Sequence, residues 1–147
     1  MHSLVLELTG KKAPRNGLEG KFSVYHACAA GLIFGHAGEA EFADGVVTRA
    51  DVVALRERIS ARADEAIDEA AADVTVTCSD GRKLHLFVPH AIGSLERPMR
   101  DADLAAKFHG LVDPVLGAAR AAALIEQCEK AAAASDVRGL TAAARPG

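Results

Sequence analysis

The sequence predicts an α+β fold, in which the helices are segregated from a largely antiparallel sheet. Three observations predict this class. Apolar and polar residues alternate on both sides of Asp80-Gly81, apolar residues recur at helical spacing from 22 to 33, and alanine-rich helical patterns fill the last third of the chain. Because no internal repeat or linker separates these patterns, we expect residues 1–147 to form a single domain.

The first apolar run is short and predicts a strand. Leu4, Val5, Leu6 and Leu8 are followed by Gly10, which is expected to end it. Residues 11–20 contain two glycines and a proline, so they are predicted to form a loop.

A helix is predicted over residues 21–34, because four residues spaced by four, three and four share one face: Phe22, His26, Ala29 and Ile33. Another side of this helix carries only small residues, Ala27, Ala30 and Gly31, which predicts close approach by a neighbouring element. Gly35 is expected to end the helix.

A short helix is predicted next, since Thr48 and Asp51 have the spacing of a capping box. Val52, Leu55 and Ile59 continue its apolar face. A strand over residues 55–60 is an alternative for the same segment.

The hairpin around Asp80-Gly81 is the clearest local pattern. Val74, Val76 and Cys78 precede the turn and Leu84, Leu86 and Val88 follow it, each set alternating with other residues. A two-residue Asp-Gly loop favours a type I′ turn. We therefore expect one buried apolar face, with the other face carrying Thr75, Thr77, Lys83 and His85.

Helices are predicted for the rest of the chain. Asp101 is expected to cap one that buries Leu104, Phe108 and Leu111. Asp113 and Pro114 are expected to begin a second, which extends through residues 131–134. Residue 135 or 136 is expected to start a last short helix.

Composition excludes several classes of function. The formal net charge is −3 with no run of Lys or Arg, which argues against a nucleic-acid partner. No apolar run approaches a membrane span, and the three widely spaced cysteines suggest neither a disulfide framework nor a metal site. We expect a soluble cytoplasmic protein with free thiols, and no membrane partner, metal or cofactor.

The first candidate site lies at the start of the predicted 21–34 helix, where Lys21, Ser23, Tyr25 and His26 cluster. The amino terminus of a helix attracts anions, and these side chains add an ammonium, a hydroxyl, a phenol and an imidazole. The cluster therefore suits a carboxylate. The structural alternative is a solvated lysine, a local serine cap and two packed amphipathic rings.

The second candidate is His90 with Arg97 and Arg100, around the predicted loop over residues 92–98. Two arginines are able to clamp a carboxylate through paired N–H donors. The alternative is an ordinary solvated rim of the loop.

Four segments, in order and spacing, resemble the MmgE/PrpD family. They are Gly20-Lys21-Phe22-Ser23-Val24-Tyr25-His26 with its small-residue continuation, the hairpin from Val74 to Arg82, Gly93-Ser94-Leu95-Glu96-Arg97-Pro98-Met99, and Asp103-Leu104-Ala105-Ala106-Lys107-Phe108. The resemblance covers about residues 1–140 and is to the smaller, carboxy-terminal domain of these enzymes, which implies a two-layer α/β sandwich with carboxy-terminal helices.

What the resemblance implies is an activity on small polycarboxylates. Members such as 2-methylcitrate dehydratase, cis-aconitate decarboxylase and iminodisuccinate epimerase pair a large helical domain with the smaller domain, often as homodimers and without a redox cofactor. Their active site lies between the domains. By this resemblance His26 and Tyr25 are the candidate catalytic residues, and Lys21, Ser23, His90 and Arg97 the candidate substrate-binding residues.

The sequence departs from the family pattern in two respects. Nothing in it resembles the helical domain, so a helical partner polypeptide is expected to complete the enzyme. His26 stands where many members carry a tyrosine, in either an equivalent or a substrate-specific role. The alternative to an enzyme is a non-catalytic assembly module, or a truncated remnant, that self-associates through exposed apolar surface.

Overall fold

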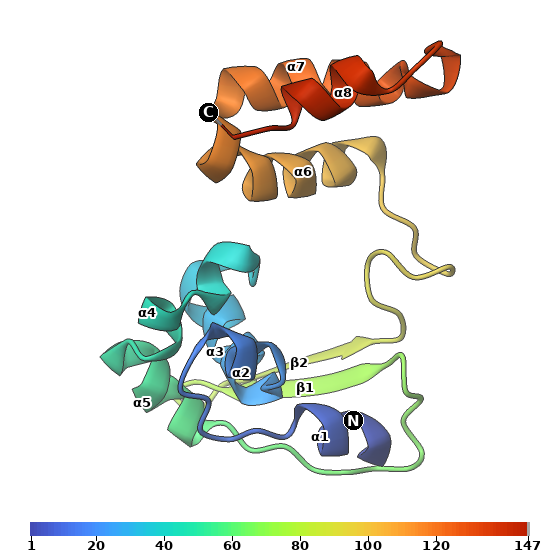
Figure 1. The fold of residues 1–147 in the computed structure, drawn as a ribbon. Coiled ribbons are helices and arrows are strands. Elements are labelled where there is room, and N and C mark those ends of the chain that lie inside the picture. The colour runs from blue at the N-terminus through green and yellow to red at the C-terminus, as the bar shows by residue number, and fades with distance from the viewer. Residues whose placement is uncertain (147) are drawn as a thin grey trace. The chain divides into compact units, whose positions relative to one another are not determined.

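The computed structural model describes residues 1–146, which form two compact units, Met1–Pro98 and residues 99–146. Figure 1 shows the elements of each unit. The first contains α1 (Ser3–Thr9), α2 (Gly17–Lys21), α3 (Val24–Phe34), η1 (Glu39–Phe42), α4 (Asp44–Val47), α5 (Ala50–Arg58), β1 (Ala72–Thr77) and β2 (Lys83–Val88). The second contains α6 (Asp101–Leu116), α7 (Ala118–Glu129), η2 (Ala131–Ala133) and α8 (Arg138–Ala143).

The fold class is α+β, as predicted. Helices dominate the described residues, and β1 and β2 form a two-stranded antiparallel sheet. The larger sheet of a two-layer sandwich and the single-domain organisation stay predictions.

The predicted first strand is wrong, because residues 3–9 form helix α1. Leu4 and Leu8 are four residues apart, a spacing that suits a helix as well as an apolar strand. His2 begins the helix by accepting a hydrogen bond from the Leu4 N–H through Nδ1, at 3.3 Å. Leucine and glutamate also favour helix intrinsically, so propensity decides a pattern that periodicity leaves ambiguous.

Helix α3 confirms the predicted helix, although it begins at Val24 rather than at residue 21. Residues 17–21 form the separate helix α2 instead of a loop. Gly35 ends α3 with φ 78°, a left-handed conformation that glycine adopts without strain. The close approach expected on the side of Ala27, Ala30 and Gly31 is found at Ala30, which is fully buried, but not at Gly31, where an added Cβ would meet nothing within 4 Å.

Helix α5 confirms the helix expected after Thr48 and rules out the alternative strand. Its cap differs from the expectation. Arg49 is the N-cap residue, its guanidinium pairs with Asp51 at 2.6 Å, and the Thr48 hydroxyl donates to the Asp44 carbonyl at 2.8 Å. The predicted capping box is therefore absent, because the Thr48 hydroxyl and the Asp51 carboxylate make these other contacts instead.

The core of the first unit lies where α3, α4 and α5 meet. Ala29 and Ala30 of α3, Val47 of α4 and Val52 of α5 are fully buried. Arg56 is buried with them, and its Nη1 donates to the Val47 carbonyl at 3.0 Å. Burial lowers the pKa of this guanidinium. Small side chains let the helices pack closely, so the start of α3 is held by a dense core.

The hairpin is confirmed, with Ala72 paired to Val88 and Thr77 to Lys83. Its turn is not type I′, which needs positive φ at both central residues. Of the turn residues 79–81, only Gly81 has a positive φ, 85°, and the Cys78 N–H donates to the Arg82 carbonyl at 2.8 Å. These contacts describe a three-residue loop over 79–81 with glycine last.

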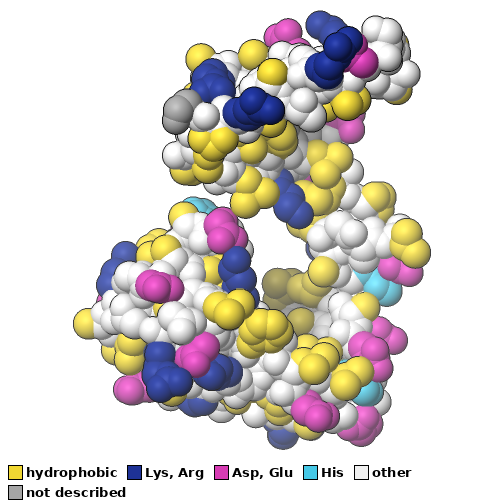
Figure 2. Space-filling model, viewed as in Figure 1, with side chains coloured by type: hydrophobic (Ala, Val, Ile, Leu, Met, Phe, Trp, Pro, Cys, Tyr) yellow, Lys and Arg dark blue, Asp and Glu magenta, His cyan; other side chains and the backbone are white. Residues whose placement is uncertain are grey.

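One face of the hairpin is entirely apolar, because residues directly opposite each other share a face. That face carries Ala72, Val74, Val76, Leu84, Leu86 and Val88. Its expected burial is wrong: Val74, Leu84 and Leu86 are 38%, 57% and 62% exposed. Figure 2 shows hydrophobic side chains at the surface of the molecule.

In the second unit, α6 continues through Asp113 and Pro114, so the expected helix start there is wrong. The Asp113 carboxylate contacts His109 Nδ1 at 2.9 Å instead of capping a new helix. The break falls at Gly117, whose φ of 80° favours glycine.

The predicted face of α6 is only partly buried, since Leu104 and Leu111 are 51% and 47% exposed. Residues 131–133 form the 3-10 turn η2 rather than a continuation of α7. The last helix is confirmed as α8, beginning at Arg138 instead of 135 or 136. No helix among residues 1–146 combines the length and apolar character of a membrane span.

Candidate functional site

The start of α3 gathers the four residues of the first candidate cluster, but they face different surroundings. Lys21 is the last residue of α2, Ser23 is the N-cap of α3, and Tyr25 and His26 occupy its first turn. Lys21 is exposed, Tyr25 is half-buried, and Ser23 and His26 are buried. The cluster is therefore partly surface and partly core.

Ser23 holds the amino terminus of α3. Its Oγ accepts the His26 N–H at 3.1 Å, which satisfies one of the free donors of the first turn. A backbone bridge between Gly10 and Ser23 ties this point to the end of α1. With only 2% of the residue exposed, the hydroxyl acts here as a structural cap.

His26 is the largest fully buried side chain of the described residues. Its Nε2 lies 2.8 Å from the carbonyl oxygen of Glu41, and its ring packs edge-on against Phe42 at 5.1 Å between centroids. A carbonyl only accepts, so Nε2 carries the proton. Nδ1 is then an acceptor, and it is buried without a hydrogen bond among residues 1–146.

Glu41 braces the loop that receives His26. Its Oε2 accepts the Gly38 N–H at 2.8 Å and contacts His36 Nδ1 at 2.9 Å. Burial raises the pKa of this carboxyl, but the Gly38 N–H and His36 outweigh burial, and the pKa lies below its ordinary value. A charged carboxylate thus fixes the loop whose carbonyl holds the imidazole.

Tyr25 meets a lysine that the sequence pattern did not single out. The Nζ of Lys12 lies 4.3 Å from the centroid of the Tyr25 ring. An ammonium over the face of a phenol is attracted by the ring electrons. The hydroxyl, at the edge of the ring, takes no part in this contact.

Lys21 is the most accessible cation of the cluster. Its Nζ contacts Glu39 Oε1 at 3.0 Å, and both side chains are about half exposed. One carboxylate occupies one of three ammonium N–H donors, so two stay available to a second anion.

The second candidate cluster forms a tight loop. The Arg97 N–H donates to Ser94 Oγ at 3.1 Å, and its carbonyl accepts the Gly93 N–H at 2.7 Å. His90 Nδ1 lies 3.9 Å from Glu96, beyond hydrogen-bond distance. Within residues 1–146, no hydrogen bond or ion pair joins this loop to the start of α3.

Comparison with known proteins decides the family. The profile of the MmgE/PrpD C-terminal domain matches residues 1–131. The chain belongs to this family. A comparison with curated proteins gave no match. The MmgE/PrpD match spans both candidate clusters and all of α7, so the resemblance seen in the sequence is confirmed.

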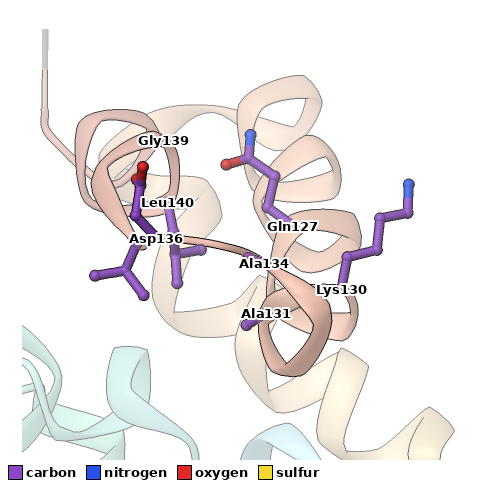
Figure 3. Close-up of a pocket in the computed structure, with 8 residues that line it drawn as sticks. Gln127, Lys130, Ala131, Ala134, Asp136, Gly139 and Leu140 are labelled. Carbon is purple, nitrogen blue, oxygen red and sulfur yellow. The ribbon is translucent and has the colours of Figure 1, made fainter.

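A shallow pocket lies outside both clusters, between α7 and α8 of this MmgE/PrpD chain (Figure 3). Its cavity of about 210 Å³ has Gln127, Lys130 and Asp136 as polar lining residues. Most of its lining lies at or beyond residue 131, where the family match ends. Within residues 1–146, no three His, Cys, Asp or Glu side chains gather as a metal site would require.

Glu19 lies in α2, just before the first candidate cluster, and its contacts make the stability of the chain depend on pH. Lys11 Nζ contacts its Oε1 at 2.9 Å and the Arg15 N–H donates to its Oε2 at 2.7 Å. These contacts, the Lys11 bond first, lower the pKa of Glu19 from 4.5 to about 2. Because the folded value is depressed, its contribution is present above pH 4.5 and is lost as the pH falls toward 2.

We expect Glu19→Gln to remove the part of the acid-induced loss of stability that falls between pH 4.5 and about 2. Urea unfolding midpoints across this range measure it. Glu7→Gln, on the exposed side of α1, is the control and should follow the unsubstituted chain. Parallel pH curves for Glu19→Gln and the unsubstituted chain would contradict the assignment.

Proposed function

We propose that this chain is the smaller domain of an MmgE/PrpD-type lyase or isomerase acting on a small di- or tricarboxylate. The reaction class is proton abstraction next to a carboxylate, followed by loss of water, by loss of carbon dioxide with reprotonation of carbon, or by reprotonation alone. The observation that carries the proposal is the family match over residues 1–131, which includes the polar cluster at the start of α3.

Within that cluster, the geometry divides the proposed roles. Lys21 supplies an accessible cation for a substrate carboxylate. Tyr25 is half-buried and has its hydroxyl free of the Lys12 contact, so it is the better placed of the two proposed catalytic residues. For His26 to touch a substrate, its ring, which is fully buried in this structure, must become accessible when the active site assembles.

Ser23 is proposed to act indirectly. Its Oγ is used as the N-cap of α3, which keeps the first turn in place. His90 and Arg97 remain proposed carboxylate ligands from the neighbouring loop, where the exposed Arg97 side chain is the more accessible.

A helical-domain partner polypeptide is part of the proposal, and the exposed apolar hairpin face supports it. Leu84 and Leu86 are more than half exposed on a face with no polar side chain. Burial of apolar surface contributes about 25 cal/mol per Å², so such a face favours a partner. We propose that the smaller domain forms a two-layer α/β sandwich, and that the assembled enzyme is cytoplasmic and needs no redox cofactor.

The decisive experiment assembles the chain with an MmgE/PrpD helical-domain polypeptide encoded by the same organism. The pair is incubated with a panel of di- and tricarboxylates in D₂O and followed by proton NMR. Loss of a C–H signal next to a carboxylate is expected for one substrate, whatever the final product. No such loss across the panel with a stably assembled pair would contradict the proposal.

Lys21→Met tests the carboxylate anchor in that assembled enzyme. Removing one charge-assisted contact should raise KM about tenfold. Stability should change little, because the Glu39 pair is exposed. Lys130→Met is the matched control, since Lys130 makes a similar exposed pair with Glu126 in the second unit. An unchanged KM for Lys21→Met would exclude this residue from substrate binding.

The second candidate function is a non-catalytic assembly module, which the same apolar hairpin face favours. In that case the chain alone should form a stable homo-oligomer. Sedimentation of the purified chain, with and without the helical polypeptide, separates the two functions.

A further inference from the structure

The ammonium of Lys12 joins three segments that are distant in sequence. Its Nζ donates to the carbonyl oxygens of Arg56 at 3.0 Å, Glu57 at 3.5 Å and Ile59. All three carbonyls belong to the last turn and C-cap of α5. The last carbonyls of a helix lack partners within it and carry partial negative charge, so a cation is favourable there.

The same ammonium faces Tyr25 at the start of α3, 4.3 Å from the ring centroid. An ammonium has three N–H donors and no acceptor. The three carbonyls of α5 use all three donors, so Lys12 has none left for a substrate. This distinguishes it from Lys21, whose described partner is one exposed carboxylate.

We infer that Lys12 is a positioning residue: anchored on the end of α5, it fixes the ring of Tyr25 and thereby the direction of its hydroxyl. The inference rests on the proposed function only where it concerns catalysis. The contact holds the ring in place and leaves the hydroxyl free. A phenol that donates a hydrogen bond or acts as an acid or base needs both a fixed orientation and a free hydroxyl.

The chain offers a direct probe, because Tyr25 is its only tyrosine and it has no tryptophan. The tyrosine band of near-ultraviolet circular dichroism therefore reports the immobilisation of this one ring. In the full chain without partner or substrate, Lys12→Met should lose about half of that band, since the ring loses the cation that holds it in one orientation. Lys12→Arg should retain most of it by keeping charge and donors.

Two variants control for folding. Lys11→Met removes the neighbouring lysine, which contacts Glu19, and should leave the tyrosine band unchanged. If Lys12→Met fails to fold, Lys12→Gln keeps a donor for the α5 carbonyls and removes the charge over the ring, with the same loss expected. A folded Lys12→Gln or Lys12→Met chain with an unchanged tyrosine band would overturn the inference.

Kinetics of the assembled enzyme test the link to catalysis. Lys12→Gln should lower kcat about tenfold with KM unchanged, and Lys12→Arg should restore it. An unchanged kcat would overturn the catalytic part. If no substrate turns over, the proposed function fails, while loss of the tyrosine band still supports positioning of the ring by Lys12.

Discussion

Gly17→Ala is expected to destabilise the first unit by about 3 kcal/mol, at the upper end of what overpacking costs. A Cβ at Gly17 would lie 2.0 Å from the carbonyl oxygen of Phe42 and 3.2 Å from its carbon. Those are backbone atoms, which do not rotate away as a side chain does. The Gly17 N–H also donates to Asp44 at 2.6 Å, so α2 is not free to move outward.

Chemical denaturation of the full chain measures this cost, and Gly31→Ala is the matched control. Gly31 is an exposed residue toward the C-terminal end of α3, with nothing within 4 Å of an added Cβ. Alanine there should stabilise the chain by about 1 kcal/mol, because it removes the entropic penalty of glycine in a helix. Similar effects from the two substitutions would show that α2 and η1 are not packed as described.

His26→Ala is the second substitution with a large expected effect, on both stability and turnover. It empties a fully buried site, removes the contact with Phe42 and leaves the Glu41 carbonyl without its donor. We expect a loss of about 3 kcal/mol, typical of truncating a large buried side chain. His85→Ala is the control: this exposed histidine pairs with Asp73 on the hairpin and should cost far less.

Turnover separates a catalytic role of His26 from a structural one. Measured on the assembled enzyme at a temperature where the variant remains folded, His26→Ala should reduce kcat well beyond any change in the folded fraction. An unchanged kcat in the folded variant would leave His26 as a core histidine. This experiment is decisive because the buried hydrogen bond from Nε2 to the Glu41 carbonyl by itself predicts only a structural role for His26.

Some elements of the fold could be predicted from the sequence because neighbouring residues determine them. The apolar face of α3 and Gly35 define the helix and its end, because both act within a few residues, whereas its start was predicted at residue 21 instead of Val24. The hairpin strands follow from strict alternation in the same way. The last helices were harder, because Pro114 suggests a helix start from sequence alone while the chain continues helically to Gly117.

Contacts between residues far apart in the sequence could not be predicted, because they produce no local sequence pattern. Lys12 meets carbonyls more than 40 residues away, and a lysine in a charged loop carries no sign of such partners. The hydrogen-bond partner of His26 was equally hidden, since its acceptor lies 15 residues later, in η1. The burial of the hairpin face was predicted wrongly for another reason. Alternation predicts an apolar face that needs a packing partner, but it does not say whether the same chain supplies that partner.

The hydrogen bond between His26 and Glu41 runs to a main-chain oxygen. Any residue at position 41 offers that oxygen, provided the loop keeps its course. Paired substitutions between the two positions are therefore not to be expected among relatives, and covariation would miss this contact. What evolution must preserve is the path of the backbone from Gly38 to Phe42, and with it the capping that sets that path.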